Sequence, residues 1–321
     1  MICLETKTSL SVFWMYLRFS MTCLPVKKFV LTSSLLPSAI YEPGTGWGSV
    51  GGGYEYQHFH VNPKNPEDVY LAGSDQVRRV SKANRAWQII DPEPTGAHDY
   101  YMPLAFHPTN GDILYAGIQH VWRSTNRGTS WTDLGLPMSN AGAVFELEVA
   151  PSDARVLYVL TRSSSQIWKS TDEGATWTSF TNTVQDWRFT RALAIAPDNA
   201  QTLWVGRGEG LYRSTDGGAS IQRITSFPTI AVNYIRVNPA NAAQLFVATA
   251  AGVLLSTPAG ATWRQLGAQL PPISVTELVM ANNSLYAANN QGIWQISLSR
   301  QPPCSLTAVL SPLDSTALCK A

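Results

Sequence analysis

The sequence predicts an all-β fold that is built from a repeated four-stranded unit. Three observations support this prediction: a short strand with an aromatic residue recurs six times, an apolar strand precedes each copy, and a Ser-x-x-x-Gly turn follows most copies. Repeats of about 40 to 50 residues are typical of propellers and solenoids. The aromatic residues are Tyr70, Tyr115, Tyr158, Trp204, Phe246 and Tyr286, spaced by 45, 43, 46, 42 and 40 residues.

The segments around each aromatic strand predict its neighbours. The apolar strand before it ends in a turn with Pro or Asn, as in "LAFHPTN" and "LEVAPSDA", and these residues favour chain reversal. A third strand follows, such as "VWRS" or "IWKS". In four units the third strand leads into the pattern Ser-Thr-x-x-Gly-x-Ser/Thr-Trp, at residues 124–131, 170–177, 214–221 and 256–263. Ile replaces Trp in the third of these, and a shortened fifth copy ends at Trp87. A capping Ser or Asp oxygen and a Gly with positive φ suit a tight turn before a fourth strand.

These units predict a single six-bladed β-propeller of four-stranded antiparallel blades. One such sheet cannot bury both of its faces, but sheets arranged around an axis can bury them against each other. The sixth unit lacks a fourth strand, and "GWGSV" at residues 46–50 resembles the other fourth strands, so we expect this N-terminal strand to close the ring. Seven blades is the alternative. The expected division is 1–45 as a weak export signal or disordered segment, 46–297 as the propeller and 298–321 as a tail.

Composition excludes some partners. Hydrophobic residues form 45% of the chain and charged residues 14%, which is enough apolar material for a continuous core. The formal net charge of +1 gives no electrostatic footprint for nucleic acid, and no apolar stretch reaches the roughly 18 residues that span a bilayer. We therefore expect no nucleic-acid partner and no membrane span. We also expect a monomer.

The cysteines and the N-terminal segment bear on the compartment in which the protein is located. Cys3, Cys23, Cys304 and Cys319 lack the spacing of a zinc site, and the sequence predicts no metal and no cofactor. Cys304 and Cys319 could be bridged in an oxidising compartment or stay reduced. The segment from Met21, with a Lys pair and a short apolar run, favours an extracellular or periplasmic location, with a cytoplasmic one as the alternative.

The repeated pattern resembles the bacterial neuraminidase repeat, or Asp-box, β-propeller superfamily, which includes sialidases, xyloglucanases and sortilin-like proteins. The resemblance covers roughly residues 46–297 and implies the architecture and a role in handling glycans. The Arg-Ile-Pro signature of sialidases is absent, and Asp75 lies one residue too far from Tyr70 to match the xyloglucanase carboxylate. Function must therefore be argued from the site.

Candidate site residues are expected at the axis, on the innermost strands and on the loops that lead into them, while Asp172 and Asp216 are expected to be structural. Side chains alternate along a strand, so one set of inner-strand residues should form the core and the polar members of the other set should face the channel. His58 and His60 are expected to pack or hydrogen-bond rather than to bind a metal. The candidate catalytic carboxylates are Asp75, Asp99, Glu146, Glu148 and Glu277. The candidate ligand-binding residues are Tyr54, Tyr56, His58, His60, Tyr100, Tyr101, Asp186, Trp187, Arg188, Tyr234 and Arg236.

The sequence favours an exported propeller that binds a glycan or a protein partner through its axial face, because aromatic, carboxylate and arginine side chains suit either ligand. It leaves open whether the protein is an enzyme. If it is one, we expect a glycoside hydrolase with an axial carboxylate pair, which requires two carboxyl groups roughly 5 to 10 Å apart. An assembly factor or scaffold with a plugged channel is the remaining alternative.

Overall fold

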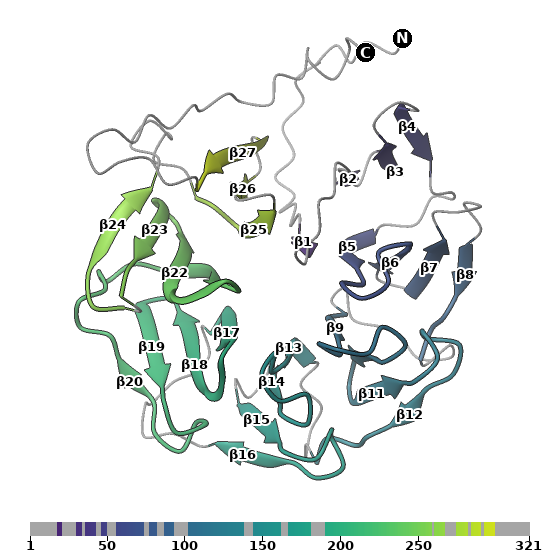
Figure 1. The fold of residues 1–321 in the computed structure, drawn as a ribbon, viewed down its shortest axis with the longest axis horizontal. Coiled ribbons are helices and arrows are strands. Elements are labelled where there is room, and N and C mark those ends of the chain that lie inside the picture. The colour runs from purple at the N-terminus through teal and green to yellow at the C-terminus, as the bar shows by residue number, and fades with distance from the viewer. Residues whose placement is uncertain are drawn as a thin grey trace.

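The structure, a computed structural model, describes residues 18–20, 30–33, 36–42, 46–49, 56–73, 77–81, 87–92, 102–137, 144–161, 166–180, 190–258, 260–266, 274–281, 284–289 and 292–298, some of them by their backbone alone. Over these residues it is an all-β protein whose antiparallel sheets follow one another around a centre (Figure 1). This confirms the predicted fold class.

Six sheets carry the six sequence repeats, and in each the chain runs from the centre outwards. The aromatic residue of every repeat lies in the second strand, as predicted. The first three sheets are β5 (Tyr56–Val61), β6 (Asp68–Gly73), β7 (Val77–Ser81) and β8 (Trp87–Ile89); β9 (Leu104–Phe106), β10 (Leu114–Gly117), β11 (Val121–Ser124) and β12 (Thr132–Asp133); and β13 (Val144–Val149), β14 (Leu157–Thr161), β15 (Ile167–Ser170) and β16 (Thr178–Phe180).

The other three sheets are similar, and in two of them the second strand is longer. They are β17 (Ala192–Ala196), β18 (Asn199–Arg207), β19 (Gly210–Ser214) and β20 (Gln222–Arg223); β21 (Val232–Asn238), β22 (Asn241–Thr249), β23 (Gly252–Ser256) and β24 (Trp263–Leu266); and β25 (Glu277–Ala281), β26 (Ser284–Asn289) and β27 (Gly292–Ser297).

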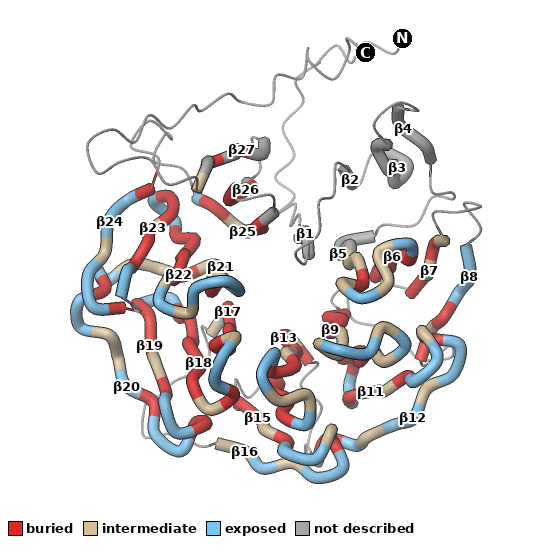
Figure 2. Tube along the Cα trace, in the orientation of Figure 1, coloured by how far each residue is buried: buried red, intermediate tan, exposed pale blue. Residues whose placement is uncertain are grey.

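The core lies between consecutive sheets. Five clusters of buried side chains are described, and each joins one sheet to the next, from the first and second to the fifth and sixth. The inner and second strands supply most of these residues, whereas the outer strands and turns are exposed (Figure 2). Each repeat therefore buries its faces only by stacking on its neighbours, as expected for a repeat that is not stable alone.

The predicted closure of the ring by residues 46–50 is not observed. Gly46–Ser49 forms a strand, β4, but β4 pairs with β3 (Leu36–Glu42), which pairs with β2 (Val30–Ser33) in a separate three-stranded sheet. β3 and β4 are joined by residues 43–45, which read Pro-Gly-Thr, and a hairpin with so short a connection closes at little entropic cost. A different segment, β1 (Arg18–Ser20), pairs in parallel with β5 and contacts β25.

The described strands β1 to β3 thus lie within the N-terminal segment that was expected to be an export signal or disordered, and the domain boundaries stay a prediction. The tail at 298–321, with Cys304 and Cys319, lies outside the described residues apart from Leu298, and so do Cys3 and Cys23.

Candidate functional site

The four repeated turns, at residues 124–131, 170–177, 214–221 and 256–263, are held together by their own side chains. In each, the Ser Oγ accepts a hydrogen bond from the backbone N–H of the Gly four residues later, at 2.7 to 2.8 Å. These serines are buried. The pattern that defines the repeat in the sequence is therefore a requirement of turn geometry.

The carboxylates of two repeated turns also accept hydrogen bonds from residues of their own turn. Asp216 Oδ1 accepts from the Ser220 backbone N–H at 2.9 Å and from Ser214 Oγ at 2.8 Å, and Ser220 Oγ donates to Oδ2 at 2.6 Å. The hydroxyl and the backbone N–H of Ser220 hold the pKa of Asp216 down at about 2. Asp172 makes the equivalent contacts with Ser170 and Thr176, and its pKa is lowered for the same reason. Both carboxylates are structural, as expected.

Each repeated turn also docks on the sheet that precedes it. A Cβ added to Gly128, Gly174 or Gly218 would lie 2.5 Å from Ile90 Cδ1, 2.4 Å from Leu134 Cδ1 or 2.7 Å from Phe180 Cε2, respectively. The Trp131 Nε1 donates to the Ile90 carbonyl at 2.7 Å, and the Trp177 Nε1 donates to the Leu134 carbonyl at 3.4 Å. The turns are thus contacts between sheets, at the outer part of the ring.

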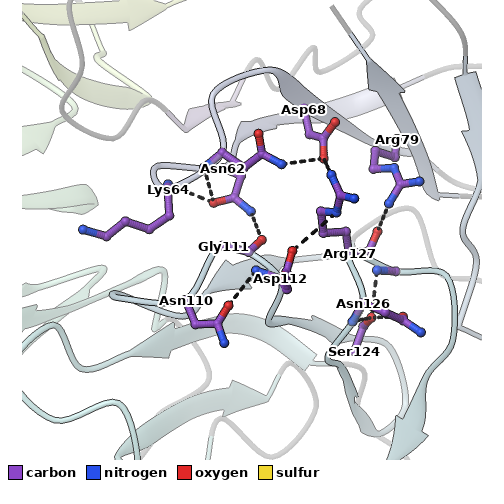
Figure 3. Close-up of polar contacts among 12 residues, drawn as sticks. Asn62, Lys64, Asp68, Arg79, Asn110, Gly111, Asp112, Ser124, Asn126 and Arg127 are labelled. Carbon is purple, nitrogen blue, oxygen red and sulfur yellow. Dashed lines mark hydrogen bonds and ion pairs between the residues drawn. The ribbon is translucent and has the colours of Figure 1, made fainter.

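A polar network joins the first two sheets at their short turns (Figure 3). Asn62, which is fully buried, donates to the Gly111 carbonyl at 2.6 Å and accepts from the backbone N–H groups of Lys64 and Asn65. Arg127 Nη1 lies 3.4 Å from Asp68 Oδ2, and Arg127 Nε lies 3.4 Å from Asp112 Oδ1. Arg127 thus bridges the carboxylates of both sheets, so we assign this network to stability.

The candidate site is a group of five polar side chains on three inner strands, which we call the axial cluster. It consists of Glu146 and Glu148 on β13, Tyr234 and Arg236 on β21, and Glu277 on β25. Glu277 is 2% exposed and Glu146 is 8% exposed, while the other three are half-buried.

The pKa of the Tyr234 hydroxyl is influenced by the charged members of the axial cluster. Burial raises the pKa of the Tyr234 hydroxyl, the Arg236 charge opposes this rise, and the charges of Glu277, Glu146 and Glu148 add to it. Four charges from three sheets therefore lie close enough to influence one oxygen. Because the shift is upward, the hydroxyl stays protonated at neutral pH and can donate a hydrogen bond.

The inner-strand side chains of the apolar set are buried as predicted, with Leu147, Leu193, Ile235 and Leu278 between 1% and 4% exposed. The small residues of the opposite set are buried as well. Ala105 packs in the core shared by the second and third sheets, and Ala192 and Ala194 pack in the core shared by the fourth and fifth. Both faces of these inner strands therefore meet a neighbouring sheet. That the polar members of the opposite set face a channel stays a prediction.

The remaining predicted site residues are only partly described. His60, on β5, is half-buried, and its ring lies 6.2 Å from that of Phe106. Tyr56 and His58 are also on β5, but the structure describes only their backbone. The predicted residues outside the described residues are Tyr54, Asp75, Asp99, Tyr100, Tyr101, Asp186, Trp187 and Arg188.

Sequence reasoning missed a second polar group at the C-terminal end of β18. Arg207, the last residue of this strand, is buried and lies beside Glu209 in the following turn, with Tyr212 and Arg223 close by. Comparison of the residues that end the six second strands could have revealed it, because Arg207 is a charged residue at a position that is otherwise uncharged.

Among the described residues, no group of three or more His, Cys, Asp or Glu side chains is arranged to hold a metal ion. That same part of the chain also contains no helix long and apolar enough to cross a bilayer.

Comparison with known proteins supports the architecture. No protein family and no curated protein matches the sequence. Solved structures do match: an ancestral GH74 enzyme at a TM-score of 0.63 and 19% identity over 81% of this chain, and the GH74 xyloglucanase of Xanthomonas campestris at 0.63 and 17% over 83%. YCF48 from Cyanidioschyzon merolae matches at 0.53 and 12% over 74% of this chain and 80% of its own.

These similarities define the chain as a protein with a β-propeller fold. At such low identity they show the fold alone. The chain spans 38% of the ancestral GH74 enzyme and 50% of the xyloglucanase, so it corresponds to part of each enzyme.

Proposed function

We propose that this chain is an exported propeller that binds a glycan through its axial face. The observation that carries the proposal is that the charges of Glu146, Glu148, Arg236 and Glu277, on three separate inner strands, all influence the pKa of the Tyr234 hydroxyl. Sugar hydroxyl groups both donate and accept hydrogen bonds. The carboxylates accept, the guanidinium donates, and the Tyr234 hydroxyl does both, so the axial cluster can satisfy a sugar ring from several directions.

Binding can be tested with the full chain on a glycan array, followed by calorimetric titration of the oligosaccharides that bind. Tyr234→Phe removes only the hydroxyl, and Glu148→Gln changes a half-buried carboxylate without changing its shape. Each should weaken binding by about tenfold, the loss expected for one hydrogen bond to or near a charged group. Glu67→Gln is the matched control, since Glu67 is exposed in a turn outside the cluster. Unchanged affinity in both axial variants would remove the proposal.

A glycoside hydrolase is the second candidate, because three carboxylates lie near one hydroxyl and such enzymes work with a pair of carboxyl groups. Two of the structural neighbours are GH74 enzymes. Release of reducing sugar from an oligosaccharide that binds, lost in Glu277→Gln and in Glu146→Gln but kept in Glu67→Gln, would favour this candidate. Binding without any turnover would favour the first.

A further inference from the structure

The sixth sheet differs from the other repeats at its outer edge. Each of the other five third strands, β7, β11, β15, β19 and β23, pairs with a fourth strand on its outer side. Within the described part of the chain, β27 pairs with β26 along all six of its residues and has no strand on its other side. This edge is therefore the place where a further strand can add to the fold.

An open edge of this length is unfavourable for a folded protein. The outermost strands of the other five sheets contain two to four residues, whereas β27 contains six. Trp294 and Ile296 of β27 pack in the core shared with the fifth sheet and are 8% and 2% exposed, so the strand is fixed in place. A long edge of unpaired backbone groups pairs readily with other chains unless a segment covers it.

The strand register indicates where a fourth strand should follow β27. In four sheets the serine that opens a repeated turn pairs with a leucine of the second strand, as Ser170 pairs with Leu157. Ile296 pairs with Leu285 in the same way, so Ile296 occupies the serine position of the sixth sheet. Ten residues after Ile296 lies Leu306. Ten residues after each of the four serines, in the fourth strand or directly after it, the other sheets also have an apolar residue: Leu134, Phe180, Ile224 and Leu266.

The residue at this position makes the same backbone hydrogen bond in three sheets. Its N–H donates, at 2.9 Å in each case, to a carbonyl of the third strand: Ile90 to Val77, Leu134 to Val121 and Ile224 to Leu211. Ile293 is the equivalent acceptor in β27, because it lies three residues before the serine position, as Val121 and Leu211 do. The N–H and C=O groups of one strand residue point to the same side, so Ile293 and Gln295 direct their N–H groups to the open edge.

The segment that the spacing selects suits an edge strand. Residues 303–306 read Pro-Cys-Ser-Leu and continue as Thr-Ala-Val-Leu, a run without glycine or charge. The connection from β27 has Ile296 and Arg300 in place of the serine and glycine of the repeated turns, and it ends in two prolines. Proline is tolerated as the first residue of a strand and at a sheet edge. Leu298 packs against the core shared by the fifth and sixth sheets, so the chain is still held against the sheet where it leaves β27.

We propose that the outer edge of β27 is a docking site for the C-terminal segment of the same chain. Residues 303–306 pair antiparallel with β27 as the fourth strand of the sixth sheet. Leu306 lies opposite Ile293, and its N–H donates to the Ile293 carbonyl. The segment thereby covers the long edge of β27 and limits sheet extension between molecules.

Amide hydrogen exchange of the full chain, followed by NMR, tests whether the edge is covered. The Trp294 and Ile296 N–H groups alternate with those of Ile293 and Gln295 and point to β26, so they serve as an internal reference. The Ile293 and Gln295 amides should exchange as slowly as these two, because they donate to the docked segment.

Variants of the tail test whether residues 303–306 are the segment that docks. Leu306→Pro removes the donor and should speed exchange at Ile293 and Gln295 by about tenfold or more, while Trp294 stays protected. Leu310→Pro makes the same change beyond the proposed strand and should have no effect. If Leu306→Pro does not fold, Leu306→Asn, which keeps the N–H but removes the apolar side chain, should speed exchange at the same two amides.

Two kinds of result would overturn the proposal. Fast exchange at Ile293 and Gln295 in the unmodified chain would mean that the edge is open. Slow exchange that both Leu306 variants leave unchanged would mean that something else covers the edge. The occupant is then a second copy if protection rises with protein concentration, or the strand β4 if Gly48→Pro removes the protection.

Discussion

Replacing Gly174 by Ala tests whether the repeated turns hold neighbouring sheets together. Gly174 has a φ of +91°, and an added Cβ would lie 2.4 Å from Leu134 Cδ1 and 3.3 Å from Trp177 Cζ2. Two separate penalties are therefore expected. One is the positive φ, and the other is the overlap with a side chain of the preceding sheet.

The magnitudes of the two penalties can be separated with a second glycine. A positive φ costs an L-residue about 1–2 kcal/mol, and overpacking costs about 1–3 kcal/mol, so Gly174→Ala should lower the free energy of unfolding by about 2–5 kcal/mol. Gly135 also has a positive φ, of +52°, but nothing lies within 4 Å of an added Cβ. Gly135→Ala should therefore cost only about 1–2 kcal/mol.

Urea unfolding followed by tryptophan fluorescence measures both variants. A double-mutant cycle with Leu134→Ala isolates the contact, because this substitution removes the methyl group that the new Cβ would meet. In that background, the cost of Gly174→Ala should fall to that of Gly135→Ala. An unchanged cost in the two backgrounds would refute the explanation of Gly174 as a docking residue.

Three further predictions concern the repeated turns and the polar network between the first two sheets. The pKa of Asp216 in the folded protein is lowered to about 2, so its stabilising effect is complete above the unfolded value of about 4 and is lost as the pH falls towards 2. Asp216→Asn should therefore reduce the fall of the melting temperature in acid. Trp131→Phe should cost about 1 kcal/mol more than Trp177→Phe in urea unfolding, since the indole hydrogen bond is 2.7 Å long in the first and 3.4 Å in the second. Asn62→Ala removes three hydrogen bonds from a fully buried side chain and should lower the free energy of unfolding by about 2–4 kcal/mol, with faster amide exchange at Lys64 and Asn65.

The repeat was predictable from the sequence because it reflects local requirements. The aromatic residues of the second strands, such as Tyr115 and Tyr158, are fully buried where the spacing put them. The Ser and Gly of the repeated turns form the hydrogen bonds that their spacing required. Such features depend on residues close in sequence and recur unchanged in several units.

The pairing of β4 was not predictable from the same pattern. "GWGSV" resembles a fourth strand of the repeat, yet Gly46–Ser49 pairs with β3 just before it. The similarity of a segment to other strands indicates that it forms a strand. Which strand it pairs with depends on the competition between a segment close in sequence and a distant one. A connection of three residues favours the near partner.

The axial cluster stays a prediction that the sequence supports. Alignment of the inner strands predicts Glu146, Tyr234 and Glu277 as site residues, and the charges of both carboxylates contribute to the raised pKa of the Tyr234 hydroxyl. Alternation alone does not separate core from axis, because both faces of an inner strand are covered by other sheets. Arg207 was not predicted, because its surroundings depend on the side chains of Glu209 and Tyr212, which lie at other positions of the repeat.

The short outer strands have a consequence for how copies of this protein meet each other. β12 and β20 contain two residues each, and β8 and β16 contain three. A strand of this length offers few unpaired backbone groups to another chain, which limits sheet extension between molecules. β8 is the weakest of these four edges, because Trp87 and Ile89 are each 50% exposed there. Association that begins by strand pairing at these edges should therefore begin at β8, and a charged residue in place of Ile89 should suppress it.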